Sequence, residues 1–249
     1  MLQSLYRAAL GTGFTFLMTT LGAATVFFVA KDPGAKGQRG MIGFAAGVMT
    51  AASIWSLLLP AVEQAEADGA VPGWLPAAAG LLLGVVFLAF LDDLLRRLHP
   101  EASASSNALL MTAITLHNIP EGMAVGLAFA LASEGEGLLA AATLALGIGI
   151  QNFPEGAAVA LPLRQEGYPR FRAFLGGTLS GAVEPLFGVL VVLAAAGVRS
   201  AMPWLLSFAA GAMLYVVVEE LVPQAHSRAG TGGFVGGFLV MMVLDIALG

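Results

Sequence analysis

The chain has 249 residues, of which 58% are hydrophobic and only 11% are charged. Soluble domains carry roughly 25% charged residues, so this chain has too few polar residues to cover a water-soluble globule and is predicted to lie in a lipid bilayer. Its net charge of −5 and its lack of a dense basic cluster exclude nucleic acid as a partner, and the absence of cysteine excludes disulfides and thiolate metal sites.

Eight apolar runs are long enough to cross a bilayer, whose core needs about 20 apolar residues per helix. The breaks between them are short and polar or rich in Gly and Pro, so the sequence predicts one all-α transmembrane domain covering 1–249. In chain order the predicted spans are 5–30, 40–63, 74–96, 107–132, 137–163, 172–197, 202–222 and 232–249.

The predicted loops differ in basic residues from one side of the membrane to the other. One side holds only Arg7 and Arg199, and the other holds nine of the eleven Lys and Arg residues. Because basic loops remain cytoplasmic, both termini are expected in the periplasm, with the protein in the cell inner membrane. The nine residues are Lys31, Lys36, Arg39, Arg96, Arg97, Arg164, Arg170, Arg172 and Arg228.

Three carboxylates lie in the middle of predicted spans, namely Glu121, Glu155 and Glu184. Each costs on the order of 2.5–3.5 kcal/mol at the centre of a membrane helix. No Lys or Arg lies in the middle of any predicted span to neutralise them. Protonation, a water-filled cavity or a bound cation must therefore offset their cost, which predicts a functional site near the membrane midplane.

Two of these carboxylates belong to a repeated motif, because H-N-I-P-E-G at 117–122 recurs as Q-N-F-P-E-G at 151–156. Residues three and four apart share a helix face, so each copy places a carboxylate beside two metal-capable side chains. Pro120 and Pro154 each remove a backbone donor and are expected to interrupt their helices, as at the midplane ion sites of transporters. Adjacent spans run antiparallel, so the two copies are expected to face each other across one site.

A single buried His is most often a hydrogen-bonded core residue, and a single Pro in a span is most often a kink. Neither explains two matched motifs with three carboxylates at one depth. Carboxylate, amide oxygen and imidazole suit Zn²⁺ and also Cd²⁺, Fe²⁺ and Mn²⁺, so the sequence predicts a divalent-metal transporter rather than an enzyme.

Two other functions remain open. The sequence cannot distinguish a carrier from a passive metal-selective channel. The spacing of His117 and Glu121 also occurs in zinc proteases, but a hydrolytic site needs an open water position and a general base. Duplicated amides and carboxylates suit ion passage better, so an intramembrane metalloprotease is the less favoured alternative.

At these residues the sequence resembles the ZIP family of divalent-metal transporters, specifically its bacterial GufA-like branch. Besides the two proline motifs, the resemblance is carried by 47–53, Glu184 and 219–223, and it covers nearly the whole chain. It implies a 3+2+3 arrangement in which spans 1–3 and 6–8 are inverted repeats around spans 4 and 5. It also implies import of metal into the cytoplasm.

The resemblance implies two adjacent metal positions that share Glu121 and Glu155. Asn152 stands where some members carry Asp, which leaves one or two bound metals open, and Gln151 stands where members often carry His. The first position would use His117, Glu121, Gln151 and Glu155, and the second would use Asn118, Glu121, Asn152, Glu155 and Glu184.

The resemblance further places Met49, Ser56 and Glu63 along the outer entrance. Met49 could instead be part of the packed core, and Glu63 could instead be a solvated helix end. For the run 92–97 a solvated helix end with local ion pairs is the alternative. The inner exit would comprise Glu219, Glu220, Asp93 and His99, with Asp92 and His226 nearby.

Transport is expected to couple metal release to proton uptake by Glu121, Glu155 or Glu184. The helices that hold the metal are expected to move against the others. The sequence leaves open the preferred ion, the energy coupling and whether the chain forms a homodimer.

Overall fold

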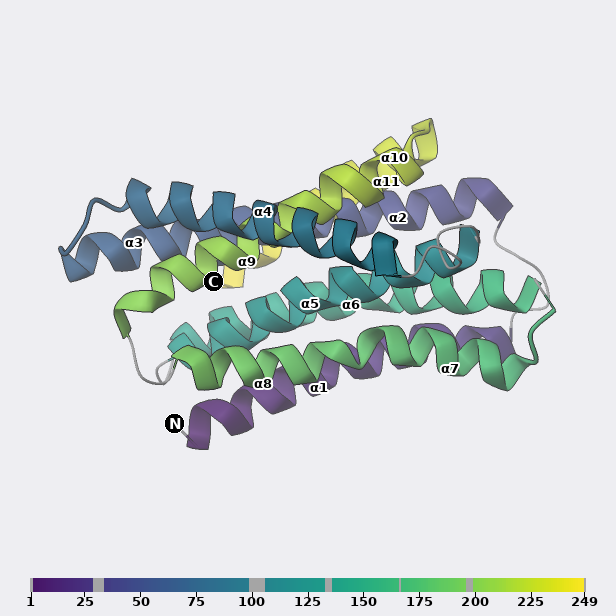
Figure 1. Cartoon of the computed structure of the whole chain (residues 1–249), viewed down its shortest axis with the longest axis horizontal. Helices are drawn as coiled ribbons and strands as arrows, with labels where there is room; N and C mark the ends of the chain where they lie inside the picture. Colours follow the sequence, from purple (N-terminus) through teal and green to yellow (C-terminus); the bar gives the residue numbers. More distant parts are fainter. Residues whose placement is uncertain are drawn as a thin grey trace.

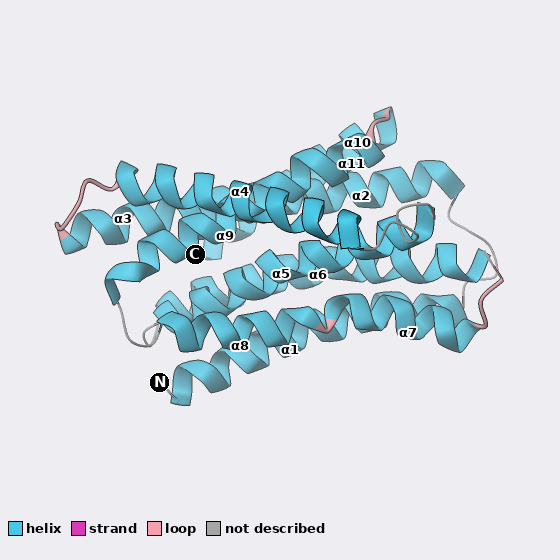
Figure 2. Cartoon of the chain, viewed as in Figure 1, coloured by secondary structure: helices cyan, strands magenta, loops and turns pink. Residues whose placement is uncertain are grey.

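The computed structural model describes residues 2–28, 34–98, 106–132, 136–165, 167–195 and 199–248. Within these ranges the chain is helical and contains no strand (Figure 2). The long helices are α1 (Leu2–Ala24), α2 (Gly34–Ala52), α4 (Trp74–Leu98), α5 (Ser106–Leu131), α6 (Glu136–Gln165), α9 (Met202–Val216) and α11 (Arg228–Leu248). The shorter ones are α3 (Leu59–Asp68), α7 (Arg170–Gly181), α8 (Val183–Ala195) and α10 (Val222–Ala225).

Seven helical segments of the described chain are long and apolar enough to cross a membrane. They coincide with seven of the predicted spans and confirm a multi-pass membrane protein. The remaining predicted span, 107–132, falls on α5, in which the described apolar stretch is the shorter Asn118–Leu131.

The helices lie roughly along one direction in two groups (Figure 1). In the first group α1 packs on α6, α5 packs on α8, and α7 follows the same edge as α8. In the second group α2 packs on α11 and α4 packs on α9. The groups meet where α2 and α11 contact α6 and where α9 contacts α5. Both termini lie toward the same end of the bundle (Figure 1).

Helices α2 and α9 both pass through a π-helical turn before a proline. The turn η2 (Ser53–Leu58) leads from α2 into α3 ahead of Pro60, and η5 (Val217–Leu221) leads from α9 into α10 ahead of Pro223. A proline lacks the N–H of a regular helix and its ring crowds the carbonyl one turn earlier. A π-turn accommodates this and is frequent at functional sites.

The predicted interruptions at Pro120 and Pro154 were wrong, because α5 and α6 continue through these prolines. One missing hydrogen bond bends a helix that is well packed on both sides without ending it. A break occurs instead in the sixth predicted span, where α7 ends at Gly181 and α8 begins at Val183.

Candidate metal site

Six polar side chains of the predicted site are buried together between α5, α6 and the beginning of α8. They are 94–100% buried, and Glu155 is the most exposed at 6%. His117 lies on α5 one turn before Glu121, but its side chain is outside the described part of the structure. The six are Asn118, Glu121, Gln151, Asn152, Glu155 and Glu184.

Hydrogen bonds join the two copies of the motif to each other and to α7 and α8. The Gln151 amide on α6 donates to Glu121 Oε1 on α5. The Asn152 amide donates to Glu184 Oε2 at 2.9 Å, and the Asn118 amide donates to the carbonyl of Ser180 at 2.8 Å. The amide nitrogens are therefore used to hold the helices together, which leaves the amide oxygens free.

Helix α1 contributes a contact that the sequence analysis missed. The Thr19 hydroxyl donates to Glu184 Oε1 at 3.1 Å, and the carbonyl of Thr15 accepts from the Asn152 amide at 3.4 Å. Thr12, Thr15 and Thr19 are all fully buried. Their three- and four-residue spacing was the available signal, because it places three hydroxyls on one face of an apolar helix.

Six oxygens of this cluster accept no hydrogen bond in the described structure, and all six are buried acceptors. They are Asn118 Oδ1, Glu121 Oε2, Gln151 Oε1, Asn152 Oδ1, Glu155 Oε1 and Glu155 Oε2. An unsatisfied buried acceptor costs about 1–3 kcal/mol and a charged one costs more. No Lys or Arg is among the buried residues of the described chain. A cation would satisfy these oxygens together.

Amide oxygens are essential to this arrangement. Among the described residues, His, Asp and Glu alone do not form a cluster of three that could hold a metal ion. A metal ion held here would need the carboxylate oxygens of Glu121 and Glu155 together with amide oxygens of Asn118, Gln151 and Asn152. Such a mixed set suits a borderline divalent ion.

The glycine that ends each motif brings the neighbouring helix close to the site. A Cβ at Gly122 would overlap the backbone of Glu184, and a Cβ at Gly156 would overlap the backbone of Thr19. Each motif therefore combines candidate metal ligands with a contact point for the helix that carries the third carboxylate or its donor.

The break between α7 and α8 places Glu184 in the first turn of α8. Ala182, between the two helices, keeps helical backbone angles and its N–H donates to the carbonyl of Leu179. Glu184 is stabilised by hydrogen bonds from Thr19 and Asn152. Pro185 follows it directly and fits an early helix position, where no N–H is needed.

Two of the predicted entrance residues, Ser56 and Glu63, line a cavity of about 390 Å³ between α3, α5, α6 and α11. Asp245, which the sequence analysis did not select, lines it too and accepts a hydrogen bond from Ser56 at 2.7 Å. Its other oxygen, Oδ2, is buried without a partner. Met49 does not line this cavity and is buried in the hydrophobic core.

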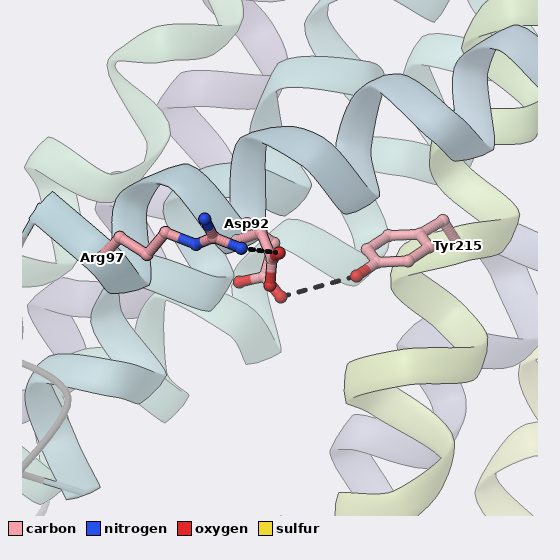
Figure 3. Close-up of polar contacts among 4 residues, drawn as sticks. Asp92, Arg97 and Tyr215 are labelled. Carbon is pink, nitrogen blue, oxygen red and sulfur yellow. Dashed lines mark hydrogen bonds and ion pairs between the residues drawn. The ribbon is translucent and has the colours of Figure 1, made fainter.

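The described residues of the predicted exit are Asp93 on α4 and Glu219 and Glu220 on η5. Asp93 and Arg97 form an ion pair at 3.2 Å, with side chains 67% and 79% exposed, which agrees with the solvated helix end considered above (Figure 3). The Tyr215 hydroxyl lies 3.5 Å from Asp92 Oδ2 (Figure 3).

Glu219 is exposed, and Glu220 is half-buried and lies 3.5 Å from the Gln224 amide. His226 is exposed, and His99 lies outside the described residues.

Comparison with known proteins gives one consistent result. Residues 96–245 match the family model described as ZIP Zinc transporter. The chain is 39% identical to the zinc transporter GufA of Myxococcus xanthus over 93% of this chain and 94% of that protein. It is 40% identical to the zinc transporter ZIPB of Bordetella bronchiseptica over 97% and 81%. It is 36% identical to the zinc transporter ZIP11 of Homo sapiens over 99% and 98%.

Proposed function

The chain belongs to the ZIP zinc transporter family, and we propose that it carries Zn²⁺ across the inner membrane into the cytoplasm. The proposed route passes through the polar cluster between α5, α6 and the beginning of α8. The observation that carries this proposal is the set of six buried acceptor oxygens without a donor. Oxygen acceptors alone, with no unpartnered nitrogen donor among them, favour a cation over an anion or a neutral solute.

We assign the first metal position to His117, Glu121, Gln151 and Glu155, and the second to Asn118, Asn152 and Glu184 with the shared Glu121 and Glu155. One divalent ion among three carboxylates leaves a charge of about −1, and two leave about +1. Either charge is cheaper to bury than three bare anions. We infer that protons replace the metal on these carboxylates after release, so that transport and proton movement are coupled.

The proposed path has one mouth at the cavity with Ser56, Glu63 and Asp245 and another at Glu219, Glu220, Asp93 and His99. In this scheme the chain spans the membrane eight times in a 3+2+3 arrangement, with both termini outside. The common end of the two termini (Figure 1) and the matched π-turns of α2 and α9 support an inverted repeat. Met49, in the core between the mouths, would line the route only in another conformation.

A site of carboxylate, amide and imidazole ligands also predicts transport of Cd²⁺, Fe²⁺ and Mn²⁺.

The positions at which helix backbones touch favour a carrier over a channel. The close backbone contacts of Gly122 and Gly156 join helices of one group, which consists of α1, α5, α6, α7 and α8. Between the two groups, Gly147 of α6 instead contacts the flexible side chain of Met241 on α11. The metal-bearing group can therefore move as a unit against its neighbours.

Uptake of Zn²⁺, Cd²⁺, Fe²⁺ and Mn²⁺ into proteoliposomes tests the proposal. His117→Ala and Glu121→Gln are expected to lower uptake about tenfold or more, as loss of metal-site residues does elsewhere. Glu66→Gln makes the same chemical change at an exposed position of α3 and should leave uptake unchanged. Normal uptake of all four ions by both site variants would overturn the site assignment.

A further inference from the structure

A second cavity opens on another face of α6, away from the polar site. It has a volume of about 480 Å³, and the described residues that line it are four of α1, one of α5 and four of α6. Eight of these nine residues are apolar or glycine, and the ninth is Arg7. None of the proposed transport residues takes part in it.

The groove exists because small residues, Gly11 on α1 and Ala142 on α6, leave space between these helices. Gly11 has no side chain, and a Cβ there would overlap the ring of Phe129, which forms the floor. Ala142 is exposed beside it on α6. The rim is formed by larger exposed side chains, including Leu10 at 57% and Leu146 at 41% exposure.

Exposed apolar side chains of a membrane protein face lipid, so this groove opens to the acyl-chain region of the bilayer. Water in such a groove would find few hydrogen-bond partners, because Arg7 is the only polar side chain among the described residues that line it. A hydrocarbon chain fills it without any desolvation cost. Grooves of a few hundred Å³ suit a single elongated ligand.

Arg7 is the one charged residue among the described residues that line the groove. It lies three and four residues before Leu10 and Gly11, so it shares their helix face near the beginning of α1. This is the end of the bundle where both termini lie (Figure 1). Arg7 is half-buried and has no hydrogen-bond or ion-pair partner in the described structure.

A guanidinium group binds phosphate through two parallel hydrogen bonds. Among the described residues no carboxylate lines the groove and Arg7 is the one charged side chain, which favours an anionic headgroup over a zwitterionic one. We propose that this groove binds one anionic phospholipid, with an acyl chain between α1 and α6 and the phosphate on Arg7. The inference concerns a separate surface and does not depend on the metal site.

Native mass spectrometry of the purified protein can test this with phosphatidylglycerol and phosphatidylcholine of identical acyl chains. The wild type is expected to retain one phosphatidylglycerol per chain about tenfold more tightly than phosphatidylcholine. Arg7→Gln should remove this preference, because only the charged contact is lost. Ala142→Phe should weaken retention of both lipids, because its ring fills the groove.

Two controls match these changes elsewhere on the surface. Arg228→Gln removes an exposed cation at the beginning of α11, and Ala78→Phe adds a ring to the exposed surface of α4. Both should retain lipid as the wild type does. Equal retention of the two lipids by the wild type would overturn the proposal. A preference that survives Arg7→Gln, or retention by Ala142→Phe equal to that of Ala78→Phe, would do the same.

Discussion

The amide nitrogen of Asn152 lies 2.9 Å from Oε2 of Glu184 and donates a hydrogen bond to it. Thr19 donates to the other oxygen of the same carboxylate, so Glu184 has a neutral donor on each oxygen. Glu155 has none on either. The three buried carboxylates therefore differ: Glu184 is stabilised by the protein itself, whereas Glu155 depends most on a cation or a proton.

Asn152→Asp replaces this donor with a second carboxylate facing Glu184. Without metal, the variant should be destabilised by on the order of 1–3 kcal/mol, because a hydrogen bond is lost and like charges are brought together. With zinc, the added charge should strengthen the second metal position. Thermal unfolding followed by tryptophan fluorescence, with chelator and with Zn²⁺, should show a lower Tm that zinc restores. Bound zinc measured by mass spectrometry should rise, and an unchanged metal count with an unchanged Tm would contradict this account.

Glu155→Gln should have opposite effects on stability and on transport. The substitution removes a buried charge that has no donor, so the Tm of the zinc-free protein should rise. It also removes a proposed metal ligand, so Zn²⁺ uptake should fall about tenfold or more. Glu66→Gln should change neither quantity. A variant that loses stability and uptake together would indicate a purely structural role for Glu155.

Thr19→Val keeps the shape of the side chain and removes its hydroxyl. Loss of the bond to Glu184 should cost about 1 kcal/mol of stability and weaken zinc binding several-fold, because the carboxylate loses its orientation. Thr20→Val is the matched control, since the Thr20 hydroxyl bonds only to the carbonyl of Phe16 on its own helix. Zinc titration of both variants should separate them, and equal affinities would exclude a role of Thr19 in the site.

The three glutamates of the site could be predicted because each stands out from the apolar residues around it in the sequence. A glutamate in an apolar span is anomalous in any fold, and its motif partners follow from helical spacing. Asp245 was missed because it lies near the end of its span, where a carboxylate is not unusual. Its hydrogen-bond partner, Ser56, is 189 residues away in the sequence.

Contacts that depend on helix packing could not be predicted. The motif includes Gly156 but does not show that the backbone of Thr19 on α1 packs against it. The presence of a proline did not by itself show which helix is interrupted. Pro120 and Pro154 lie inside continuous helices, whereas the interruption at Ala182 lies three residues before Pro185, and α8 begins at Val183.

Asp245→Asn should impair the capture of zinc more than its movement through the protein. The amide can still accept the hydrogen bond from Ser56, so the cavity keeps its shape, but a negative charge is lost beside the proposed path. Zn²⁺ uptake should show a KM several-fold higher with an unchanged maximal rate, most clearly at low ionic strength. Asp68→Asn removes a charge from an exposed position outside the cavity. The same KM shift in that control would show a general surface effect.

Gly156→Ala tests whether close helix contact holds the site together. The added methyl group would overlap the carbonyl of Thr19, so α1 must move away from α6 and the bond from Thr19 to Glu184 must lengthen. Such overpacking costs about 1–3 kcal/mol, and uptake should fall with the Tm. Gly13→Ala is the control, because a Cβ at Gly13 meets nothing within 4 Å. There the loss of backbone freedom in the unfolded chain should raise stability by about 0.5–1 kcal/mol. If Gly156→Ala behaves like Gly13→Ala in both assays, α1 and α6 need not touch for the metal site to form.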